Sequence, residues 1–145
     1  KGAGVDLILN LHDIDLPACC AKTVLCFDTL EHVEYPRKAI EEMHRILSPD
    51  GILIISSLMN FPIHNHPYDY WRFTPQGFKS LLNIFNSSII SHTGEDNFPI
   101  TILGIGFKGH APNTKKFEKE LKKWRSNNIK LSNYIKKNNI KIEKI

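Results

Sequence analysis

The chain has 145 residues, the length of a single domain, and 41% of them are hydrophobic, which is enough for a sizeable core. No stretch approaches the ~18 uninterrupted apolar residues of a membrane span, so we expect no membrane-spanning segment. Three cysteines, two of them adjacent, make no disulfide framework, and we expect a reduced, cytoplasmic setting.

The positive charge of the chain is concentrated at its carboxyl end. Residues 115–145 carry eleven Lys and Arg against three Glu, a net charge of +8. Residues 1–114 carry eight Lys and Arg against twelve acids, a net charge of −4. A basic face of this kind attracts nucleic acid or anionic lipid. A solvated helix whose charge only aids solubility has the same composition, and we favour that interpretation.

Three short apolar runs predict buried β-strands. Residues 5–11 and 22–27 are nearly continuous apolar segments, as expected for strands buried on both faces. Residues 52–56 form a third run of the same kind. A helix lies between the second and third runs. This order of strand, strand, helix and strand is typical of an α/β protein with a parallel sheet.

Two helices are predicted from their start signals and apolar stripes. Pro36 opens the first helix, whose buried stripe ends at Leu47, and residues 48–51 read as the turn that follows. Thr74 is a good N-cap for the second helix because Pro75 comes directly after it. The second helix should bury the apolar residues Phe78, Leu81, Leu82 and Phe85.

The carboxyl-terminal third predicts a hairpin and a final helix. Residues 88–92 and 100–107 read as antiparallel strands joined by a polar loop. Beyond Pro112 a basic amphipathic helix is expected, with a frayed end. Its apolar stripe would consist of Phe117, Leu121, Trp124, Leu131 and Ile135. We therefore divide the chain into a domain of residues 1–112 and a helical tail of residues 113–145.

Ligands of open parallel sheets bind beyond the carboxyl ends of the strands. Three loops should meet there: residues 12–15, 28–32 and 60–72. All three are rich in polar and ionisable side chains, while the strands before them are almost wholly apolar. This contrast predicts a functional site at that edge of the sheet.

Two segments carry a family resemblance. The segment LCFDTLEHVEYPRKAIEEMHRILSPDGILIIS resembles the core of class I S-adenosylmethionine-dependent methyltransferases of the small-molecule type. The later segment HPYDYWRFTPQGFKSLL resembles a subgroup with a DYWRFTP motif. The resemblance extends from Val5 to about Phe107. It implies a Rossmann-like sheet, S-adenosyl-L-methionine as cofactor, and methyl transfer to an acceptor that the sequence does not identify.

The chain departs from that family at its amino end. The family's glycine-rich loop and ribose-binding acid do not lie upstream of Val5. We therefore expect an amino-terminally truncated domain that lacks the first β-α-β unit, binds cofactor weakly and is inactive alone. Two alternatives stay open: a catalytically degenerate methyltransferase-fold scaffold, and a nucleic-acid binder that acts through the basic tail.

The resemblance implies five cofactor-binding residues. Asp13 would accept a hydrogen bond from the adenine amino group, while the N–H of Ile14 meets the ring. Phe27, Asp28 and His32 would line the methionine part. The alternatives are an Asx-turn for Asp13 and a place in the core for Phe27.

The loop of residues 60–72 supplies the catalytic candidates. His64, like the nearby His66, could accept a proton from a small-molecule acceptor, because the pKa of His lies near working pH. Asp69 and Arg72 could pair, and Tyr70 could cover the ligands. The alternatives are a surface histidine without a role and packing of the aromatic rings.

We expect no metal at this edge. Asp28, Glu31 and His32 nevertheless resemble the acidic and His set of some metal-binding methyltransferases, so a divalent ion stays an open alternative. The three cysteines read as core or loop residues and not as ligands or nucleophiles.

Overall fold

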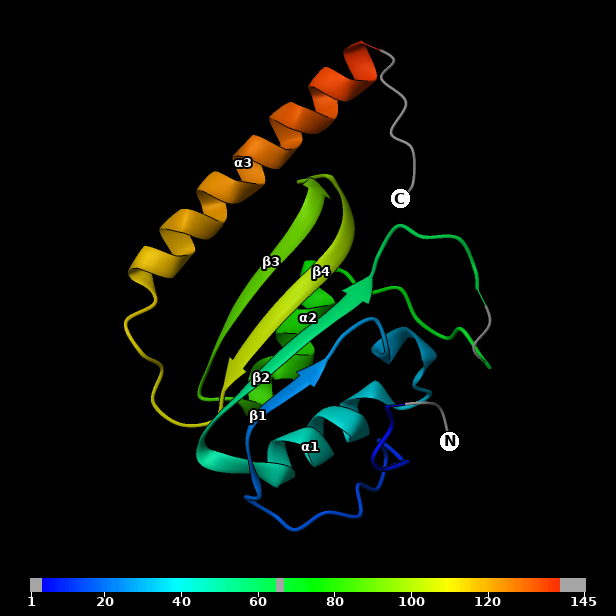
Figure 1. The fold of residues 1–145 in the computed structure, drawn as a ribbon, viewed down its shortest axis with the longest axis vertical. Coiled ribbons are helices and arrows are strands. Elements are labelled where there is room, and N and C mark those ends of the chain that lie inside the picture. The colour runs from blue at the N-terminus through cyan, green and yellow to red at the C-terminus, as the bar shows by residue number, and fades with distance from the viewer. Residues whose placement is uncertain (1–3, 65–66, 139–145) are drawn as a thin grey trace.

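The computed structural model describes residues 4–64 and 67–138. Its described strands form one sheet in the order β1-β2-β4-β3 (Figure 1). β1 pairs parallel with β2, and β4 pairs antiparallel with both β2 and β3. The strands are β1 (Ala21–Cys26), β2 (Leu47–Leu58), β3 (Ser87–Glu95) and β4 (Phe98–Phe107). The helices are η1 (Leu30–His32), α1 (Pro36–Ile46), α2 (Pro75–Leu81), η2 (Leu82–Ile84) and α3 (Lys115–Lys137).

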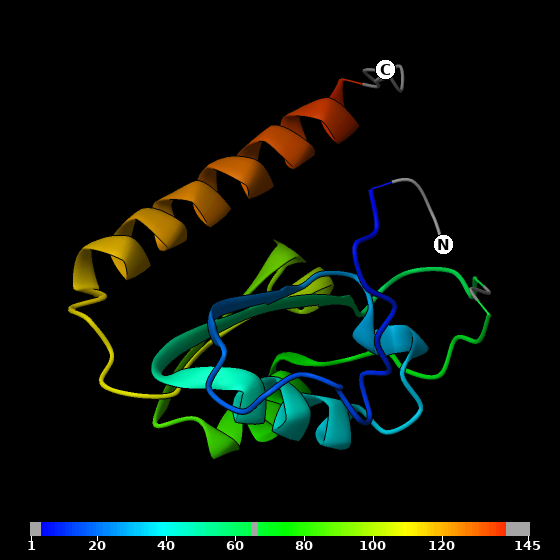
Figure 2. The same cartoon turned by 60° about the horizontal axis from the view of Figure 1, so that its bottom comes forward.

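The helices cover the sheet unequally. α1 and α2 lie together against one face, and α3 crosses the other side of the β3–β4 hairpin (Figure 2). The predicted α/β class, the antiparallel hairpin and the carboxyl-terminal basic helix are confirmed.

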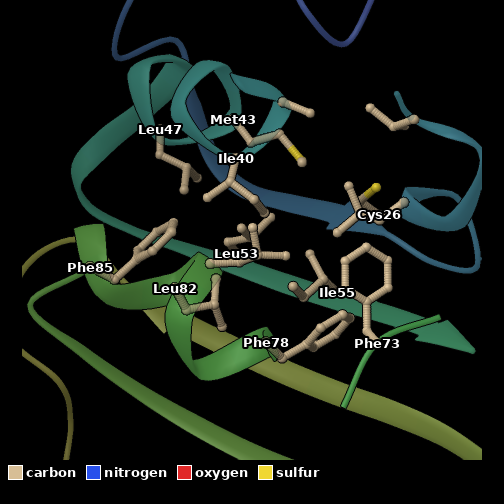
Figure 3. Packing of buried hydrophobic residues seen from close by; sticks show 14 of the residues in the cluster. Cys26, Ile40, Met43, Leu47, Leu53, Ile55, Phe73, Phe78, Leu82 and Phe85 are labelled. Atoms are coloured by element: carbon tan, nitrogen blue, oxygen red, sulfur yellow. The ribbon is translucent and has the colours of Figure 1, made fainter. Parts of the chain in front are cut away.

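The core lies between β2 and the two helices α1 and α2 (Figure 3). Leu53 and Ile55 of β2 are fully buried. They face Ile40 and Met43 of α1, and Leu82 beyond α2 closes the cluster. Each fully buried aliphatic side chain of this kind stabilises the fold by roughly 1.5–3 kcal/mol.

α1 begins at the predicted Pro36 and ends at Ile46. Pro36 occupies its first turn, where the missing N–H costs no hydrogen bond. At its other end Lys108 Nζ donates to the carbonyl oxygens of His44 and Leu47, at 2.7 and 2.6 Å. A cation at the negative end of the helix dipole neutralises carbonyls that have no partner within the helix.

α2 approaches β4 closely because β4 offers glycines there. The cap predicted at Thr74 is present, since its Oγ1 accepts from the N–H of Gly77 at 3.0 Å. A Cβ on Gly106 would lie 2.7 Å from the Phe85 ring, and one on Gly104 would lie 2.9 Å from Leu82. The glycines therefore let the buried face of α2 and η2 sit directly on the strand.

The strand predicted at residues 5–11 is wrong. Within the described residues this segment belongs to no strand, and its one β-bridge joins Asn10 to Asp13. Leu7 and Ile8 are 61% and 75% exposed. An apolar run becomes a strand only where a neighbouring strand completes its backbone hydrogen bonds, and in this structure β1 pairs with β2 alone.

Two further expectations need correction. β1 exists, but as the edge of the sheet it is not buried on both faces, and Leu25 is 59% exposed. Residues 48–51 are not a separate turn, because β2 already starts at Leu47. The pairing passes from Ala21 with Leu47 to Thr23 with Ile52, so residues 48–51 bulge out within the strand.

α3 forms as predicted, but its apolar stripe is only partly covered. Phe117 and Trp124 are each 47% exposed. Arg125 joins the helix to β3 by donating to His92 Nε2, and it also pairs with Asp96 in the hairpin turn. The end predicted to fray lies outside the described residues. No helix among residues 4–64 and 67–138 has the length and apolar character to cross a membrane.

Candidate functional site

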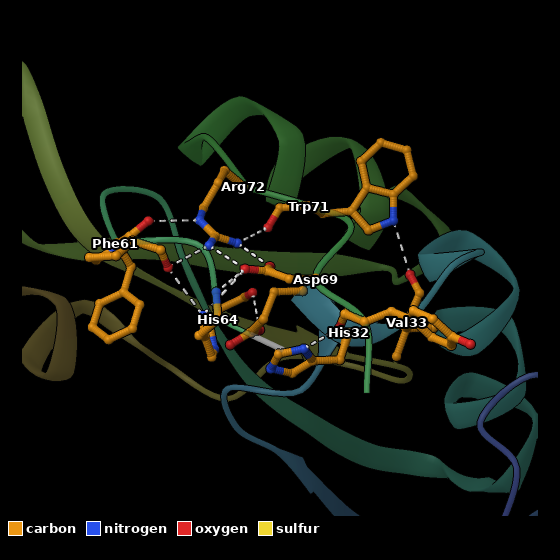
Figure 4. A network of polar contacts seen from close by, with 11 residues as sticks. His32, Val33, Phe61, His64, Asp69, Trp71 and Arg72 are labelled. Carbon is orange, nitrogen blue, oxygen red and sulfur yellow. Dashed lines mark hydrogen bonds and ion pairs between the residues drawn. The ribbon is translucent and has the colours of Figure 1, made fainter. Parts of the chain in front are cut away.

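Two of the three predicted loops meet beyond the carboxyl ends of β1 and β2. The backbone N–H groups of Tyr70 and Trp71 both donate to the carbonyl of Glu31, at 2.7 and 3.2 Å. The indole N–H of Trp71 donates to the carbonyl of Val33 at 2.9 Å (Figure 4). These bonds fasten the loop of residues 60–72 to the turn of residues 28–33.

Asp28 lies two residues beyond the end of β1 and has a strained backbone conformation. Its φ is 45°, in the left-handed region, where Asp is one of the few residues that lie without great cost. Ser56 on β2 holds it there: the Asp28 N–H donates to the Ser56 carbonyl at 3.0 Å, and Ser56 Oγ donates to Asp28 Oδ1 at 2.8 Å. The carboxylate is thereby fixed at the sheet edge while the residue stays exposed.

Glu31, three residues after Asp28, is fully buried. Its Oε2 accepts a hydrogen bond from the equally buried Ser57 at 2.5 Å. Its Oε1 is buried and has no hydrogen-bond partner among the described residues. A buried carboxylate oxygen without a partner is costly, so this atom marks a place where a ligand would be stabilising.

The loop of residues 60–72 is held together by an ion pair. Arg72 contacts both carboxylate oxygens of Asp69, at 2.5 and 2.7 Å, and donates to the carbonyls of Phe61 and Pro62 (Figure 4). Asp69 also accepts from the His64 N–H at 2.8 Å. The hydrogen bonds from Arg72, and then the one from His64, hold the pKa of Asp69 well below its usual range. Asp69 and Arg72 therefore shape the loop.

The clamped loop places His64 beside His32. The two ring centroids lie 4.8 Å apart in an edge-to-face arrangement. His32 Nδ1 lies 2.5 Å from the carbonyl oxygen of Tyr68, which comes from the same loop. Tyr70 is 42% exposed, and its partial desolvation, followed by the charge of Glu34, raises the pKa of its hydroxyl. His66 lies outside the described residues.

The loop of residues 12–16 is anchored along α1. Ile14 is buried, and its N–H donates to Glu42 Oε2 at 2.9 Å. The N–H that the resemblance assigns to the adenine ring is therefore occupied in this structure. Arg45 donates to the carbonyls of Ile14 and Leu16 and pairs with Glu42. The hydrogen bonds that Glu42 accepts from Arg45 and from the Ile14 N–H lower its pKa to about 2. Asp13 is exposed on the same loop.

The structure thus sorts the predicted residues into two groups. His32, His64, Asp69, Tyr70 and Arg72 are connected through the turn of residues 28–33 and the loop of residues 60–72. Asp13 and Ile14 lie on the segment beside α1, and Phe27 and Asp28 are exposed just beyond the end of β1.

Sequence reasoning missed Ser56 and Ser57, which hold Asp28 and Glu31. The signal was present, since two hydroxyl residues directly end an otherwise apolar strand.

A separate cavity of about 740 Å³ lies between α3 and the β3–β4 hairpin. His92, Phe98, Trp124 and Arg125 contribute to its lining. Asn60, at the start of the loop of residues 60–72, also lines it. We place the candidate site at the strand ends because the strained Asp28 and the buried Glu31 lie there.

Residues 3–55 match the family model described as a methyltransferase domain. The matched segment contains β1, α1, and the loops that hold Asp13, Asp28 and His32, and it ends within β2. None of the curated proteins compared matches the chain.

Solved methyltransferases share the fold. The CMeT domain of citrinin polyketide synthase is 13% identical with a TM-score of 0.58, over 72% of this chain and 32% of that one. The 1,6-didemethyltoxoflavin-N1-methyltransferase of Burkholderia thailandensis, solved with S-adenosylhomocysteine, is 18% identical with a TM-score of 0.54, over 69% and 48%.

The PH0226 protein of Pyrococcus horikoshii OT3 is 12% identical with a TM-score of 0.54, over 70% of this chain and 57% of that one. The chain therefore spans between about a third and three fifths of the length of these three structures. The shared fold confirms the expected Rossmann-like methyltransferase sheet.

Proposed function

We propose that this protein, whose residues 3–55 match the methyltransferase-domain family model and whose fold is shared with solved methyltransferases, takes part in methyl transfer from S-adenosyl-L-methionine. The observation that carries the proposal is the edge beyond β1 and β2. There the strained Asp28 and the turn of residues 28–33 lie within the family-matched segment. The loop of residues 60–72 is hydrogen-bonded to that turn. A relative of the same fold was solved with S-adenosylhomocysteine, which is the product of such a transfer.

The chain's own residues supply polar contacts at this edge. Asp28, fixed by Ser56, presents a carboxylate that suits the positively charged part of the cofactor. Phe27, half exposed beside it, offers an apolar surface. Asp13 would meet the adenine amino group through its exposed carboxylate, and His32 would complete the wall. Ile14 contributes its side chain and not its N–H, which Glu42 occupies.

The cofactor supplies the reactive methyl group, so the protein mainly has to align acceptor and cofactor and to exclude water. We assign the acceptor side to the loop of residues 60–72. Tyr70 is half exposed on it, and the Asp69–Arg72 pair fixes its course. His64 could take the acceptor's proton.

We propose a small molecule as acceptor, because a small-molecule methyltransferase shares the fold. The degenerate scaffold remains the alternative: it would bind cofactor at the same edge without transfer. The basic helix α3 keeps the nucleic-acid alternative open, since residues 115–145 carry a net charge of +8.

A titration followed by amide NMR tests the proposal even when affinity is weak. S-adenosyl-L-methionine added to millimolar concentration should shift the amide signals of residues 13–15 and 27–32. The signals around His92 and Trp124, at the cavity beside α3, should stay in place. Shifts confined to that cavity, or no shifts at all, would overturn the proposal. A titration with adenosine in place of the cofactor shows which of these amide shifts come from binding of the adenosine part alone.

Turnover separates the enzyme from the scaffold. Transfer of a labelled methyl group to any member of a panel of small hydroxyl, amine and carbon acids supports the enzyme. Shifts at the predicted edge without transfer to any acceptor, in a form of the protein that binds cofactor tightly, support the scaffold.

A further inference from the structure

We propose that Glu31, His32 and His64 form a binding site for one divalent transition-metal ion of the zinc type. One ligand atom from each of the three residues lies within 4.8 Å of the others. Glu31 and His32 come from η1, whereas His64 comes from the loop after β2, so only the fold brings them together.

The partnerless oxygen of Glu31 is the first argument for an ion. Its carboxylate is fully buried and is held on one side by Ser57, which leaves Oε1 without a partner among the described residues. A metal ion would give Oε1 a partner and would also compensate the negative charge of the buried carboxylate. Arg72, whose charge interacts with that of Glu31, already has both oxygens of Asp69 as partners.

The two imidazoles are oriented as metal ligands usually are. A histidine that binds a metal through one ring nitrogen normally donates the other N–H to a carbonyl or a carboxylate. His32 Nδ1 lies 2.5 Å from the carbonyl oxygen of Tyr68. His64 Nδ1 lies 3.2 Å from the carbonyl oxygen of Pro62 and 3.3 Å from Asp69 Oδ2. These acceptors favour a proton on Nδ1 of both rings, which leaves the lone pair on Nε2.

The ligand types select the ion. Imidazole nitrogen suits Zn²⁺, Co²⁺, Ni²⁺ and Fe²⁺, whereas Mg²⁺ and Ca²⁺ prefer sets of oxygen ligands. Two histidines and one carboxylate leave an open coordination position. Bonds of about 2.0–2.2 Å require the three ligand atoms to approach one another from their present spacing. The imidazole of His64 can provide part of this movement by side-chain rotation, because the side chain is 30% exposed.

This site differs from the set of Asp28, Glu31 and His32 that the sequence left open. The Asp28 carboxylate is engaged by Ser56, and the structure puts His64 in its place. An ion would use the lone pair that His64 needs as a proton acceptor, so the two roles of His64 exclude each other. Metal binding is measurable without cofactor or acceptor, and its failure is therefore distinct from failure of methyl transfer.

The test measures Zn²⁺ and Co²⁺ binding by competition with a chromophoric chelator. Cys19 and Cys20 are exposed thiols, and thiolates are zinc ligands, so the parent and every variant carry Cys19→Ser and Cys20→Ser to remove this competing site. We expect one ion per chain and a visible Co²⁺ spectrum. Glu31→Gln and His64→Ala should each weaken binding at least tenfold. Millimolar Mg²⁺ should not displace Zn²⁺.

His110→Ala is the matched control, since this histidine is exposed on the loop before α3. It should bind zinc within twofold of the parent. Glu31→Gln keeps the shape of a buried side chain, and His64 lies on a loop, so circular dichroism should show both variants folded. The proposal is overturned if the parent does not bind zinc. It is also overturned if Glu31→Gln and His64→Ala are folded and bind zinc as tightly as the parent does. Effective competition by Mg²⁺ overturns it as well.

Discussion

Arg45 pairs with Glu42 at 2.8 Å and also donates to the carbonyl of Ile14 at 2.6 Å, so one guanidinium ties the loop of residues 12–16 to α1. Glu42 completes the connection by accepting from the Ile14 N–H. The segment that carries Asp13 is therefore positioned by α1 and not by a strand of its own.

This arrangement predicts an acid-dependent loss of stability. The pKa of Glu42 falls from 4.5 to about 2 in the folded protein. A depressed carboxyl pKa stabilises the fold above the unfolded value, and the contribution is lost as the pH falls toward the folded value. Glu42→Gln should therefore be less stable than the parent above pH 4.5. The difference should shrink between pH 4.5 and 2, as urea unfolding at a series of pH values will show.

The pKa of Asp69 is also lowered, but Asp69 is present in both proteins and its contribution cancels in the comparison. A stability difference that stays constant down to pH 2 would contradict the proposed contribution of Glu42.

The close approach of α2 to β4 predicts that Gly106→Ala is destabilising. The added Cβ would lie 2.7 Å from the buried Phe85 ring, which has to move. Overpacking of this kind costs about 1–3 kcal/mol. Gly77→Ala is the control, because its Cβ would meet nothing nearer than Thr74 Oγ1 at 3.5 Å. Urea unfolding should rank Gly106→Ala as the less stable, and equal stabilities would refute the packing argument.

The three thiols should differ in reactivity. Cys19 and Cys20 are exposed, while Cys26 is buried at the end of β1. Burial is the largest cause that raises the pKa of Cys26, so its thiolate is scarce as well as hidden. An aromatic disulfide reagent should titrate two thiols quickly and the third only in denaturant. Rapid reaction of all three in the folded protein would show that β1 opens readily.

Asp13 and Asp15 should respond differently to mutation. We expect Asp13→Ala to weaken cofactor binding and Asp15→Ala to change it little, because one carboxylate from this loop meets the adenine amino group. Both residues are exposed, so neither change should disturb the fold. Binding titrations of the two variants measure the effect. Equal losses would mean that the register assigned to residues 12–16 is wrong.

His64→Ala and Tyr70→Phe should affect the transfer step more than cofactor binding. In an active form of the protein, we expect slower single turnovers with the cofactor Kd within about threefold, which corresponds to roughly 0.7 kcal/mol. Only His64→Ala should also lose zinc, since Tyr70 is not one of the three proposed ligands. Loss of cofactor affinity with an unchanged rate at saturating cofactor would make this loop a cofactor clamp.

The sequence by itself determined the elements whose signals are local. These signals are the proline at the start of α1, the cap at Thr74, the polar loop between the two hairpin strands and the amphipathic pattern of α3. Each involves residues close together in sequence, and the structure contains the corresponding elements. The sequence also predicts which edge of the sheet carries the candidate site, because the carboxyl end of a parallel strand is defined by chain direction alone.

Only the tertiary structure decided which segments find partners. The apolar run of residues 5–11 reads like β2, yet it has no neighbouring strand in the described structure and stays exposed. His64 stands 32 residues after His32, and no periodicity predicts that the Asp69–Arg72 pair folds the loop back onto η1. Such contacts depend on hydrogen bonds between distant segments, which sequence patterns of period two or 3.6 do not encode.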